Sequence, residues 1–386
     1  MALQAMVPLR MSHQTDQMPH ALLTEAPLFG GIVASGVVFF AIPGWFDDPM
    51  ATPTRSIILF SLLFCLILWS AFSVVRHADC LAVLLGEPLG TIILTLAVIG
   101  IEVTMISMLM LTGDANPALG RDTMFSVLML VLNGLVAMTL LIGGLKHHEP
   151  KFNFSGANAY LSVIIPLAAL GLVLPELTTS TADASASMTL SIFLIVMCVL
   201  LYGLFLGVQT MRHRHFFTQP TDDSMDVVDT HHPPASMRTV PWHAVLLILT
   251  MVPVVLLSKK LAILLDVGIE QLGAPTALAG LVVAILVLTP EAVAAAKAAA
   301  ANQLQRGVNI CLGSALATIG LTIPAVIMIG FAIGMPVQLG LNKVDSLLLF
   351  LTLLVCTVTF SGSRTNILQG GVHAVIFLAW LVLMFD

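Results

Sequence analysis

Charged side chains are scarce in this sequence of 386 residues: Asp, Glu, Lys and Arg together make up 9% of it, whereas hydrophobic residues make up 58%. A soluble domain with a single core does not have this composition, so a polytopic membrane protein is predicted. The few basic residues form no stripe, which argues against nucleic acid as a partner. The partner that this composition predicts is the lipid bilayer.

Cysteine is sparse as well. The five cysteines lie in or beside apolar runs and at no metal-ligand spacing, so neither a disulfide framework nor a zinc site is expected. They are Cys65, Cys80, Cys198, Cys311 and Cys356. Packing is the role predicted for them.

Signatures of processing and of enzymatic chemistry are also missing. Residues 1–20 contain no basic region followed by an apolar run and a small-residue cleavage site, so no cleavable signal peptide is expected. No nucleophile elbow is present, and His147-His148-Glu149 lacks the HExxH spacing of a zinc protease. A membrane-embedded enzyme is therefore a weaker alternative than a transporter, and no cofactor is expected.

Long apolar runs are what the sequence does contain. A spanning helix needs about 20 mostly apolar residues, and eleven runs of this kind lie between polar or Gly/Pro punctuation. They cover residues 28–45, 56–75, 83–111, 122–144, 159–177, 187–210, 241–266, 274–301, 307–333, 345–361 and 371–385. The predicted fold class is an all-α polytopic membrane protein with about 11 transmembrane helices.

One long polar interruption covers residues 211–240. Before it lie one extra N-terminal run and a group of five runs, and after it lies a second group of five. LAVLL at 81–85 resembles LAILL at 261–265, and Gly86 corresponds to Gly273. An odd number of spans per repeat makes the second copy enter from the opposite face. The predicted division is an N-terminal tail (1–27), an extra transmembrane helix (28–48), two inverted five-helix repeats (49–215 and 241–386) and an acidic linker (216–240).

The basic residues predict the orientation of the chain. If the N-terminus is cytoplasmic, ten of the 15 Lys and Arg residues fall on the inside and five on the outside. An excess of Lys and Arg marks the cytoplasmic face of a membrane protein. The N-terminus and the linker are therefore predicted to be cytoplasmic.

Two glutamates lie deep in apolar runs and are the strongest functional candidates. Glu102 stands in TIILTLAVIGIEVTMISMLML and Glu291 in LVVAILVLTPEAVAAA, at matched places in the two predicted repeats. Intramembrane carboxylates are costly and mark ion pathways, so a shared site for cations and protons is predicted at these residues. The structural alternative is a pair of acids satisfied by lysine or hydroxyl groups inside the bundle.

Two threonines precede the first acid on one helical face. Thr91 and Thr95 lie 11 and 7 residues before Glu102, which brings all three to nearly the same side of a helix. This stripe predicts a hydrated path to the acid. The alternative is that each hydroxyl bonds a carbonyl of its own helix.

Thr289 and Pro290 directly precede the second acid in LTPEA. The proline ring leaves the carbonyls of Leu286 and Val287 without their usual partners. Carboxylate, carbonyl and hydroxyl oxygens are the ligands that a hard cation prefers. The stretch therefore predicts oxygen ligands around Glu291, with Thr289 as a further candidate.

Weaker candidates lie on neighbouring helices. Ser126 and Ser314 follow the two acids by 24 and 23 residues, and Asn133 is a third polar residue in the same region. Each is a ligand if it lies near the acids and a helix-packing group otherwise. On the helix of the second acid, the small residues Gly280 and Ala284 predict the close approach of another helix.

The linker carries an acidic stripe, Asp222, Asp223, Asp226 and Asp229, which would share one face if the segment is helical. The segment contains the letters DDxxD of prenyl-transferring enzymes, but it lacks the apolar helix that an isoprenoid site requires. A solvated linker and a cytoplasmic cation-sensing segment remain the alternatives.

Several segments together resemble the calcium/proton antiporter family of the cation/calcium exchanger superfamily, most closely its bacterial ChaA-type sodium(potassium, calcium)/proton antiporters. They are SAFSVVRHADCLAVLLGEPLGTIILTLAVIGIEV, GDANPALGRDTMFSV, GGLKHHEPKFNFSGANAYL, LVLTPEAVAAAKAAAANQLQRGVNICLGSALATI and SGSRTNILQGGVHA. The resemblance implies that Glu102 and Glu291 are paired acids that bind cation and protons in turn. It also implies that residues 222–229 belong to a cytoplasmic linker and that the membrane is a bacterial inner membrane.

The chain departs from the pattern of the wider superfamily. The glycine-asparagine pair before each acid is replaced by Val98-Ile99 and Val287-Leu288, and Ala317 stands near the place of an expected glutamine. Each departure removes an amide ligand, and with it a reason for strict calcium selectivity.

The expected function is export of cytoplasmic Ca²⁺ in exchange for H⁺ by alternating access. Na⁺/H⁺ or K⁺/H⁺ antiport at the same acids is the alternative among transporters, and a membrane-embedded cation sensor is an alternative of another class. Assembly into a homo-oligomer is left open.

Overall fold

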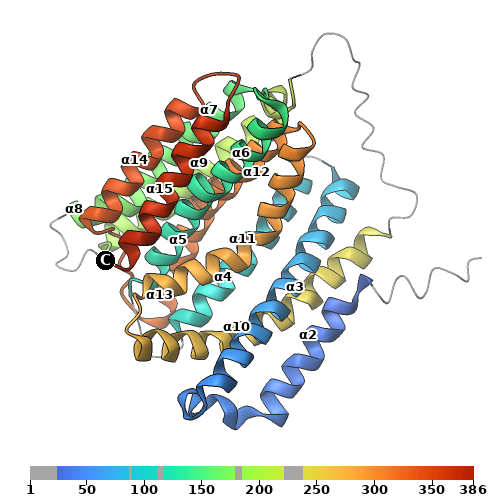
Figure 1. Cartoon of the computed structure of the whole chain (residues 1–386), viewed down its shortest axis with the longest axis vertical. Helices are drawn as coiled ribbons and strands as arrows, with labels where there is room; N and C mark the ends of the chain where they lie inside the picture. The colour runs from blue at the N-terminus through green and yellow to red at the C-terminus, as the bar shows by residue number, and fades with distance from the viewer. Residues whose placement is uncertain (1–23, 87–88, 112–116, 179–184, 221–237) are drawn as a thin grey trace, which may run out of the picture.

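The structure is a computed structural model of the chain, and it describes residues 24–86, 89–111, 117–178, 185–220 and 238–386 (Figure 1). The four linker aspartates, and nearly all of the predicted N-terminal tail, lie outside the described residues. Where the chain is described it is helical, and extended pairing is limited to two isolated bridges.

The helices follow the order of the apolar runs. Those before the linker are α2 (Ala26–Gly36), α3 (Pro53–Leu85), α4 (Leu89–Met110), α5 (Leu119–Met129), α6 (Val136–His147), α7 (Phe154–Ala168), α8 (Leu174–Leu177) and α9 (Met188–Gly207). Those after it are α10 (Val240–Leu272), α11 (Ala277–Ala300), α12 (Leu304–Ala317), α13 (Ile323–Ile333), α14 (Lys343–Thr359) and α15 (Ile367–Met384).

Short segments of other helix types continue or join these helices. The π-helical segments are η1 (Val37–Ala41), η4 (Leu130–Leu135), η5 (Ala169–Val173), η6 (Val208–Arg212) and η8 (Thr318–Thr322). The 3-10 turns are η2 (Pro43–Phe46), η3 (Pro49–Ala51) and η7 (Arg214–Phe217).

The number and nature of the helices agree with the predicted fold class. Within the described residues, nine continuous helical segments are long and apolar enough to cross a membrane. A shorter apolar helix covers Ala26–Ala41, and α14 has 17 residues. Together these account for the eleven predicted runs one by one, which confirms an all-α polytopic membrane protein.

Two predicted boundaries are wrong. α3 continues to Leu85, although residues 83–85 were expected to open the next span, and it ends because Gly86 takes a φ of 65°. α10 continues to Leu272, beyond the predicted end at 266, and ends at Gly273 with a φ of 60°. Both extensions carry charged residues, which a hydropathy pattern places outside the membrane.

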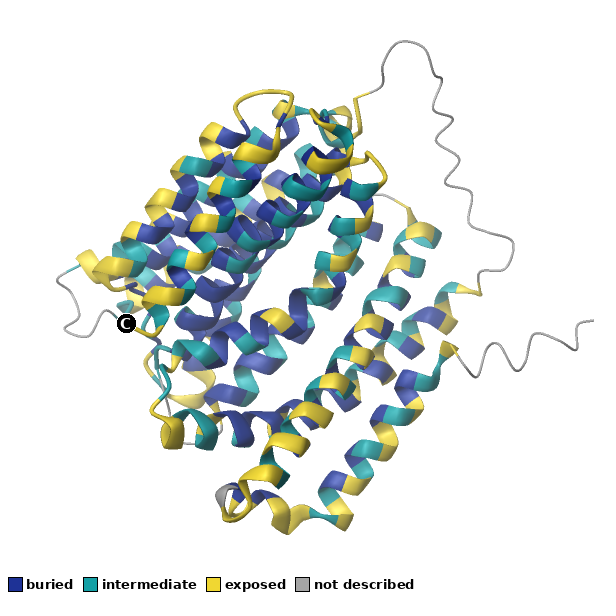
Figure 2. Cartoon of the chain, viewed as in Figure 1, coloured by how far each residue is buried: buried dark blue, intermediate teal, exposed yellow. Residues whose placement is uncertain are grey.

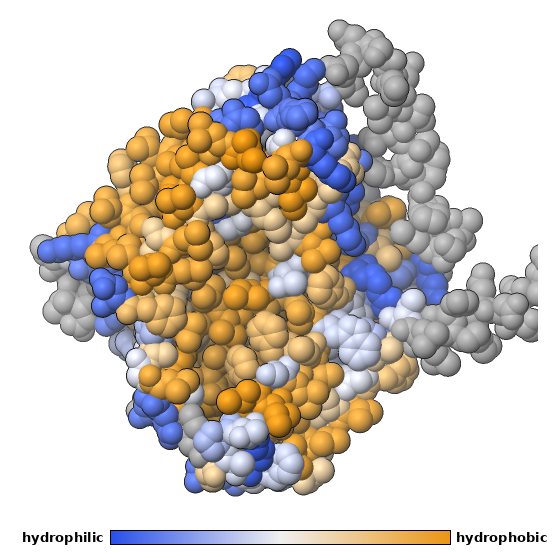
Figure 3. All heavy atoms as spheres, viewed as in Figure 1, coloured by the Kyte–Doolittle hydropathy of each residue, from blue (hydrophilic) through white to orange (hydrophobic). Residues whose placement is uncertain are grey.

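The outer surface of the bundle is apolar. Exposed residues lie on the outward faces of the helices and buried ones in the interior (Figure 2). Hydrophobic residues cover the middle of the molecule, and hydrophilic residues gather toward its top and bottom (Figure 3). Phe40, Leu200 and Val382 leave 87%, 66% and 68% of their surface exposed. A large apolar belt of this kind is a lipid-contacting surface.

α3 and α10 are the longest helices, with 33 residues each, and they pack side by side (Figure 1). They run antiparallel, because His77 near the end of α3 contacts His243 in the first turn of α10. The following helices also correspond: η4 and η8 interrupt equivalent segments, and Asn153 and Asn342 cap α7 and α14. The division into two inverted repeats stays a prediction, and these correspondences support it.

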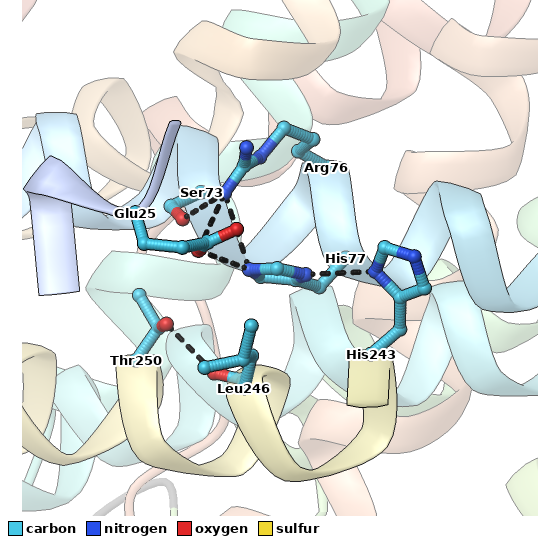
Figure 4. A network of polar contacts seen from close by, with 7 residues as sticks. All are labelled: Glu25, Ser73, Arg76, His77, His243, Leu246 and Thr250. Atoms are coloured by element: carbon cyan, nitrogen blue, oxygen red, sulfur yellow. Dashed lines mark hydrogen bonds and ion pairs between the residues drawn. The ribbon is translucent and has the colours of Figure 1, made fainter. Parts of the chain in front are cut away.

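A polar network ties the N-terminal helix to this pair (Figure 4). The Glu25 carboxylate lies 2.9 Å from Arg76 Nη2 and 3.0 Å from His77 Nε2. Arg76 also donates to Ser73 Oγ at 3.1 Å, and His77 Nδ1 lies 3.0 Å from Nδ1 of His243. Because the charges satisfy one another at the apolar helix interface, the network fixes the start of α2 against α3 and α10.

Candidate functional site

The two intramembrane acids lie on helices that contact each other. Glu102 is past the middle of α4 and is 1% exposed, and Glu291 follows Pro290 on α11. The two carboxylates are close enough to interact electrostatically. Residues far apart in the sequence are therefore brought to one place inside the bundle.

Both acids line a cavity of about 330 Å³. Its walls come from α3, α4, α7, α9, η6, α11, α12 and η8. The polar lining residues are Asp79, Thr91, Thr95, Glu102, Tyr160, Tyr202, Gln209, Glu291, Arg306, Asn309, Ser314 and Thr318. A cavity of this size and polarity has room for several water molecules beside a cation.

The carboxylates are only partly satisfied by protein groups. Oε2 of Glu102 accepts a hydrogen bond of 3.0 Å from the Thr318 hydroxyl. Oε1 of Glu102 and Oε2 of Glu291 are buried without a hydrogen-bond partner in the described part of the chain. The Thr322 hydroxyl, one turn after Thr318, faces the Glu102 carboxylate as well. These oxygens are available to a proton or a cation.

The threonine stripe of α4 lies along the cavity. Thr91, Thr95 and Val98 line it on the way to Glu102, over 11 residues or roughly 16 Å of helix. Thr95 is hydrogen-bonded with the phenol of Tyr202. The predicted arrangement on one face is therefore present, and its role as an ion path stays a prediction.

Only some of the residues in the LTPEA stretch line the cavity. Pro290 and Glu291 line the cavity, and α11 continues through the proline without interruption. The Thr289 hydroxyl does not line it, because it donates to the Ile285 carbonyl of its own helix at 2.5 Å. The prediction of Thr289 as a cation ligand therefore finds no support in its placement.

The weaker candidates separate into two groups. Ser314 lines the cavity with the acids. Asn133 does not: its amide donates to Thr352 at 2.9 Å, and its carbonyl oxygen lies 3.3 Å from His373 Nδ1, in a network that joins η4 to α14 and α15. Ser126 is buried outside the cavity lining, and its hydroxyl has no hydrogen-bond partner in the part of the chain that the structure describes. Asn133 thus has the helix-packing role of the two expected alternatives.

Several lining residues were missed by sequence reasoning. Tyr160 and Gln209, hydrogen-bonded at 2.9 Å, come from helices with no recognised acid. Thr318 lies on a π-helical segment that composition does not reveal. Asp79 and Arg306 were assigned to the regions outside the spans. Only these last two gave a signal, since each is a charge close to a long apolar run.

The cavity opens toward one end of the bundle. Asp79 and Arg306 line it and are exposed, near the end of α3 and the start of α12. On the other side of the acids the lining ends, with no residue of α4 after Glu102 and none of α11 before Leu288 among those described. There α11 packs closely on α5: a Cβ added to Gly280 would lie 2.9 Å from the backbone of Asp122 and Thr123. Gly280 therefore permits the close helix contact that its size predicts.

An all-helical bundle with a lipid-facing belt and a pair of carboxylates in a one-sided cavity defines a membrane transporter. Residues 55–211 and 242–385 match the family described as sodium/calcium exchanger protein. The chain belongs to this family, which confirms the resemblance read from its motifs and places it among transporters, not enzymes. The two matched stretches fall inside the two predicted repeats.

Two relatives cover most of the chain. The sodium-potassium/proton antiporter ChaA of Escherichia coli (strain K12) is 42% identical over 319 residues, which is 83% of this chain and 86% of the relative. The putative ionic transporter y4hA of Sinorhizobium fredii is 39% identical over 361 residues, 92% and 94% of the two chains. A Ca(2+)/H(+) antiporter of Aphanothece halophytica is 23% identical over 247 residues, 61% of this chain and 66% of the relative.

Solved structures share the fold at lower identity. The structure of native YfkE has a TM-score of 0.71 at 18% identity and covers 94% of this chain and 99% of its own. The crystal structure of the H+/Ca2+ exchanger CAX has a TM-score of 0.61 at 11% identity and covers 93% and 89%. At such identities the likeness shows the fold alone.

Proposed function

We propose that the protein is a cation/proton antiporter that exports Ca²⁺ in exchange for H⁺, with Glu102 and Glu291 as the shared binding site. The observation that carries the proposal is a pair of buried carboxylate oxygens in one cavity, neither of which has a hydrogen-bond partner among the described residues. A carboxylate buried in a membrane protein needs a proton or a cation to neutralise it. Two protons or one Ca²⁺ neutralise the pair equally, so each cargo displaces the other.

Alternating access follows from the one-sided cavity. The cavity opens at the end where α3 terminates and α12 begins, which the distribution of basic residues predicts to be cytoplasmic. Cations enter there when the acids lose their protons. Closing this end and opening the opposite one carries the same site to the other face of the membrane.

Na⁺/H⁺ or K⁺/H⁺ exchange is the second candidate. A relative of 42% identity is named a sodium-potassium/proton antiporter. Beside the acids the chain also has apolar residues, Ile99 and Leu288, where amides would complete the oxygen shell of Ca²⁺. The amides in the cavity lining, Gln209 and Asn309, are bonded to Tyr160 and to the Phe217 carbonyl.

The direct test uses the purified parent protein in proteoliposomes with an acidic interior. We expect Ca²⁺ added outside to release internal protons and to accumulate inside, as read by a pH-sensitive dye and by ⁴⁵Ca²⁺ uptake. Proton release by Na⁺ or K⁺ without Ca²⁺ would select the second candidate. If none of the three cations moves protons, antiport is excluded.

Thr318→Val tests the hydroxyl that supports Glu102. The substitution keeps the shape of the side chain and removes the donor to Oε2. A hydrogen bond to a charged group is worth about 1.5 to 3 kcal/mol, so we expect the KM for the cation to rise by about tenfold or more. Steady-state exchange at several cation concentrations measures the change.

Thr289→Val is the matched control for Thr318→Val. Its hydroxyl bonds the Ile285 carbonyl, and its side chain is outside the cavity lining, so we expect the KM of the parent protein. Equal effects of the two substitutions would contradict the geometry of the site.

Three further assignments stay predictions. They are a bacterial inner membrane with a cytoplasmic N-terminus, a cation-sensing role for the linker, and a homo-oligomeric assembly.

A further inference from the structure

The cavity mouth, defined by Asp79 on α3 and Arg306 on α12, has no part in the exchange site proposed above. Both residues line the cavity and both are exposed. The Asp79 carboxylate interacts electrostatically with the Arg306 guanidinium and with Glu291 deeper in the cavity. A negative charge and a positive charge therefore flank the route to the acids.

The two charges are near each other but not bonded. No ion pair of 4.0 Å or less joins the side chains of Asp79 and Arg306, both of which the structure describes. The Asp79 carboxylate is thus open to a cation that arrives from solvent. Arg306 competes with such a cation for the carboxylate and also repels it.

Corresponding positions in the second half carry the same residue types. Asp79 and Asp266 each lie seven residues before the glycine that ends a helix of 33 residues. Arg306 and Arg121 are each the third residue of their helices, α12 and α5. An aspartate and an arginine are therefore placed at equivalent positions toward each end of the bundle.

The second arginine shows what happens at the closed end. Arg121 Nε donates to Asp122 Oδ1 at 2.8 Å, and its Nη1 donates to the Gly340 carbonyl at 2.9 Å. It thus links α5 to the segment before α14. Arg306, at the open end, is exposed. The arginine is engaged where the bundle is closed and faces solvent where the cavity is open.

We infer that Asp79 and Arg306 set the apparent affinity for the cargo cation at the open face: Asp79 attracts the cation into the cavity and Arg306 opposes it. Asp266 and Arg121 do the same at the opposite face once the cavity opens there. The inference rests on the cation/proton exchange proposed above. It adds residues that act on the cation before Glu102 and Glu291 bind it.

Charges at the rim of a cleft with apolar walls raise or lower the local concentration of an ion by tenfold or more. They do not change the chemistry at the deeper site. Neutralising them should therefore alter KM and leave kcat at saturating cation unchanged. Salt screens such long-range effects, so the change in KM should shrink at high ionic strength.

The test measures exchange in everted membrane vesicles, in which the predicted cytoplasmic face is outside. With Asp79→Asn at low ionic strength we expect the KM for the cation to rise about tenfold with kcat unchanged. Arg306→Gln should lower the KM about threefold. Misfolding does not produce opposite signs at neighbouring positions. Asp79→Glu and Arg306→Lys keep the charges and should behave as the parent protein.

Variants at the corresponding positions of the second half show at which face of the membrane each aspartate acts. Asp266→Asn should change the KM only for cation offered to the opposite face, in right-side-out vesicles. Glu270→Gln, an exposed acid on the next turn of α10 outside the cavity lining, should change neither KM. If Asp79→Asn changes the KM in right-side-out vesicles and Asp266→Asn changes it in everted ones, both aspartate–arginine pairs act as inferred and the predicted orientation of the chain is reversed.

Two results would overturn the inference while the parent protein still exchanges. One is an unchanged KM for both Asp79→Asn and Arg306→Gln. The other is a loss of kcat with no dependence on ionic strength, which indicates a structural role. A parent protein that exchanges no cation removes the proposed function itself, and the two failures are thereby distinguished.

Discussion

Glu102→Gln and Glu291→Gln are each expected to lower the rate of cation/proton exchange by at least about a hundredfold. Each substitution keeps the size of the side chain and removes one of the two negative charges of the site. Removing one partner of a buried charge interaction costs about 3 to 5 kcal/mol, and every 1.4 kcal/mol is about a factor of ten. With one negative charge left, the site can no longer neutralise a divalent cation or bind a second proton.

The same variants should fold as well as the parent protein. Oε1 of Glu102 and Oε2 of Glu291 have no hydrogen-bond partner in the described residues, so a neutral amide relieves the cost of burying an unpaired charge. We expect an unchanged or higher melting temperature in detergent, together with lost exchange. This combination separates a binding role from a structural one.

Glu149→Gln is the control for both acids. Glu149 pairs with Arg364 at 3.2 Å, and the two side chains are 63% and 58% exposed, so the pair contributes little to stability. Its exchange rate should equal that of the parent protein. If either Glu102→Gln or Glu291→Gln exchanges at the parent rate, the shared-site mechanism is wrong.

The sequence predicts the part of this site that lies along single helices. Glu102 and Glu291 stand out because a carboxylate in an apolar run is costly, and Thr91 and Thr95 follow from the helical period alone. Their common face along the cavity needed no knowledge of the tertiary structure. The same holds for the order of the spans, which rests on hydropathy.

Contacts between distant helices were beyond prediction. Thr318 reaches Glu102 across 216 residues of sequence, and nothing in the sequence of η8 signals that partner. Thr289 shows the opposite case. It lies two residues before Glu291, yet its hydroxyl donates to the Ile285 carbonyl of its own helix. A residue that is close in sequence to a ligand does not have to point its side chain into the same site, because successive residues of a helix point to different sides.

The ends of α3 and α10 show how a wrong boundary concealed Asp79 and Asp266, the two aspartates of the inference above. Hydropathy stops each span at the first charges, so Asp79 fell into a predicted loop and Asp266 was taken as the end of its span. Both helices in fact run on to a glycine with positive φ. Asp79 lines the cavity mouth, where a charge does not end the helix, and hydropathy does not contain that information.

Gly280→Leu is expected to lose most of the folded protein. A Cβ at this position would lie 2.9 Å from the carbonyl oxygen of Asp122 and 2.9 Å from N and Cα of Thr123. These are backbone atoms of α5, so no side-chain rotation relieves the clash. Overpacking typically costs about 1 to 3 kcal/mol, and a rigid backbone contact belongs at the upper end.

The measurement for Gly280→Leu is the yield of monodisperse protein and its melting temperature in detergent. Gly203→Leu on α9 is the control, because no atom of the described residues lies within 4 Å of a Cβ added there; we expect the parent's yield and melting temperature. Gly280→Ala introduces the same Cβ with nothing beyond it, so an intermediate loss is expected. Parent-like behaviour of Gly280→Leu would mean that α5 and α11 are not held at this distance. The bundle would then lack the closed side on which one-sided access to the acids depends.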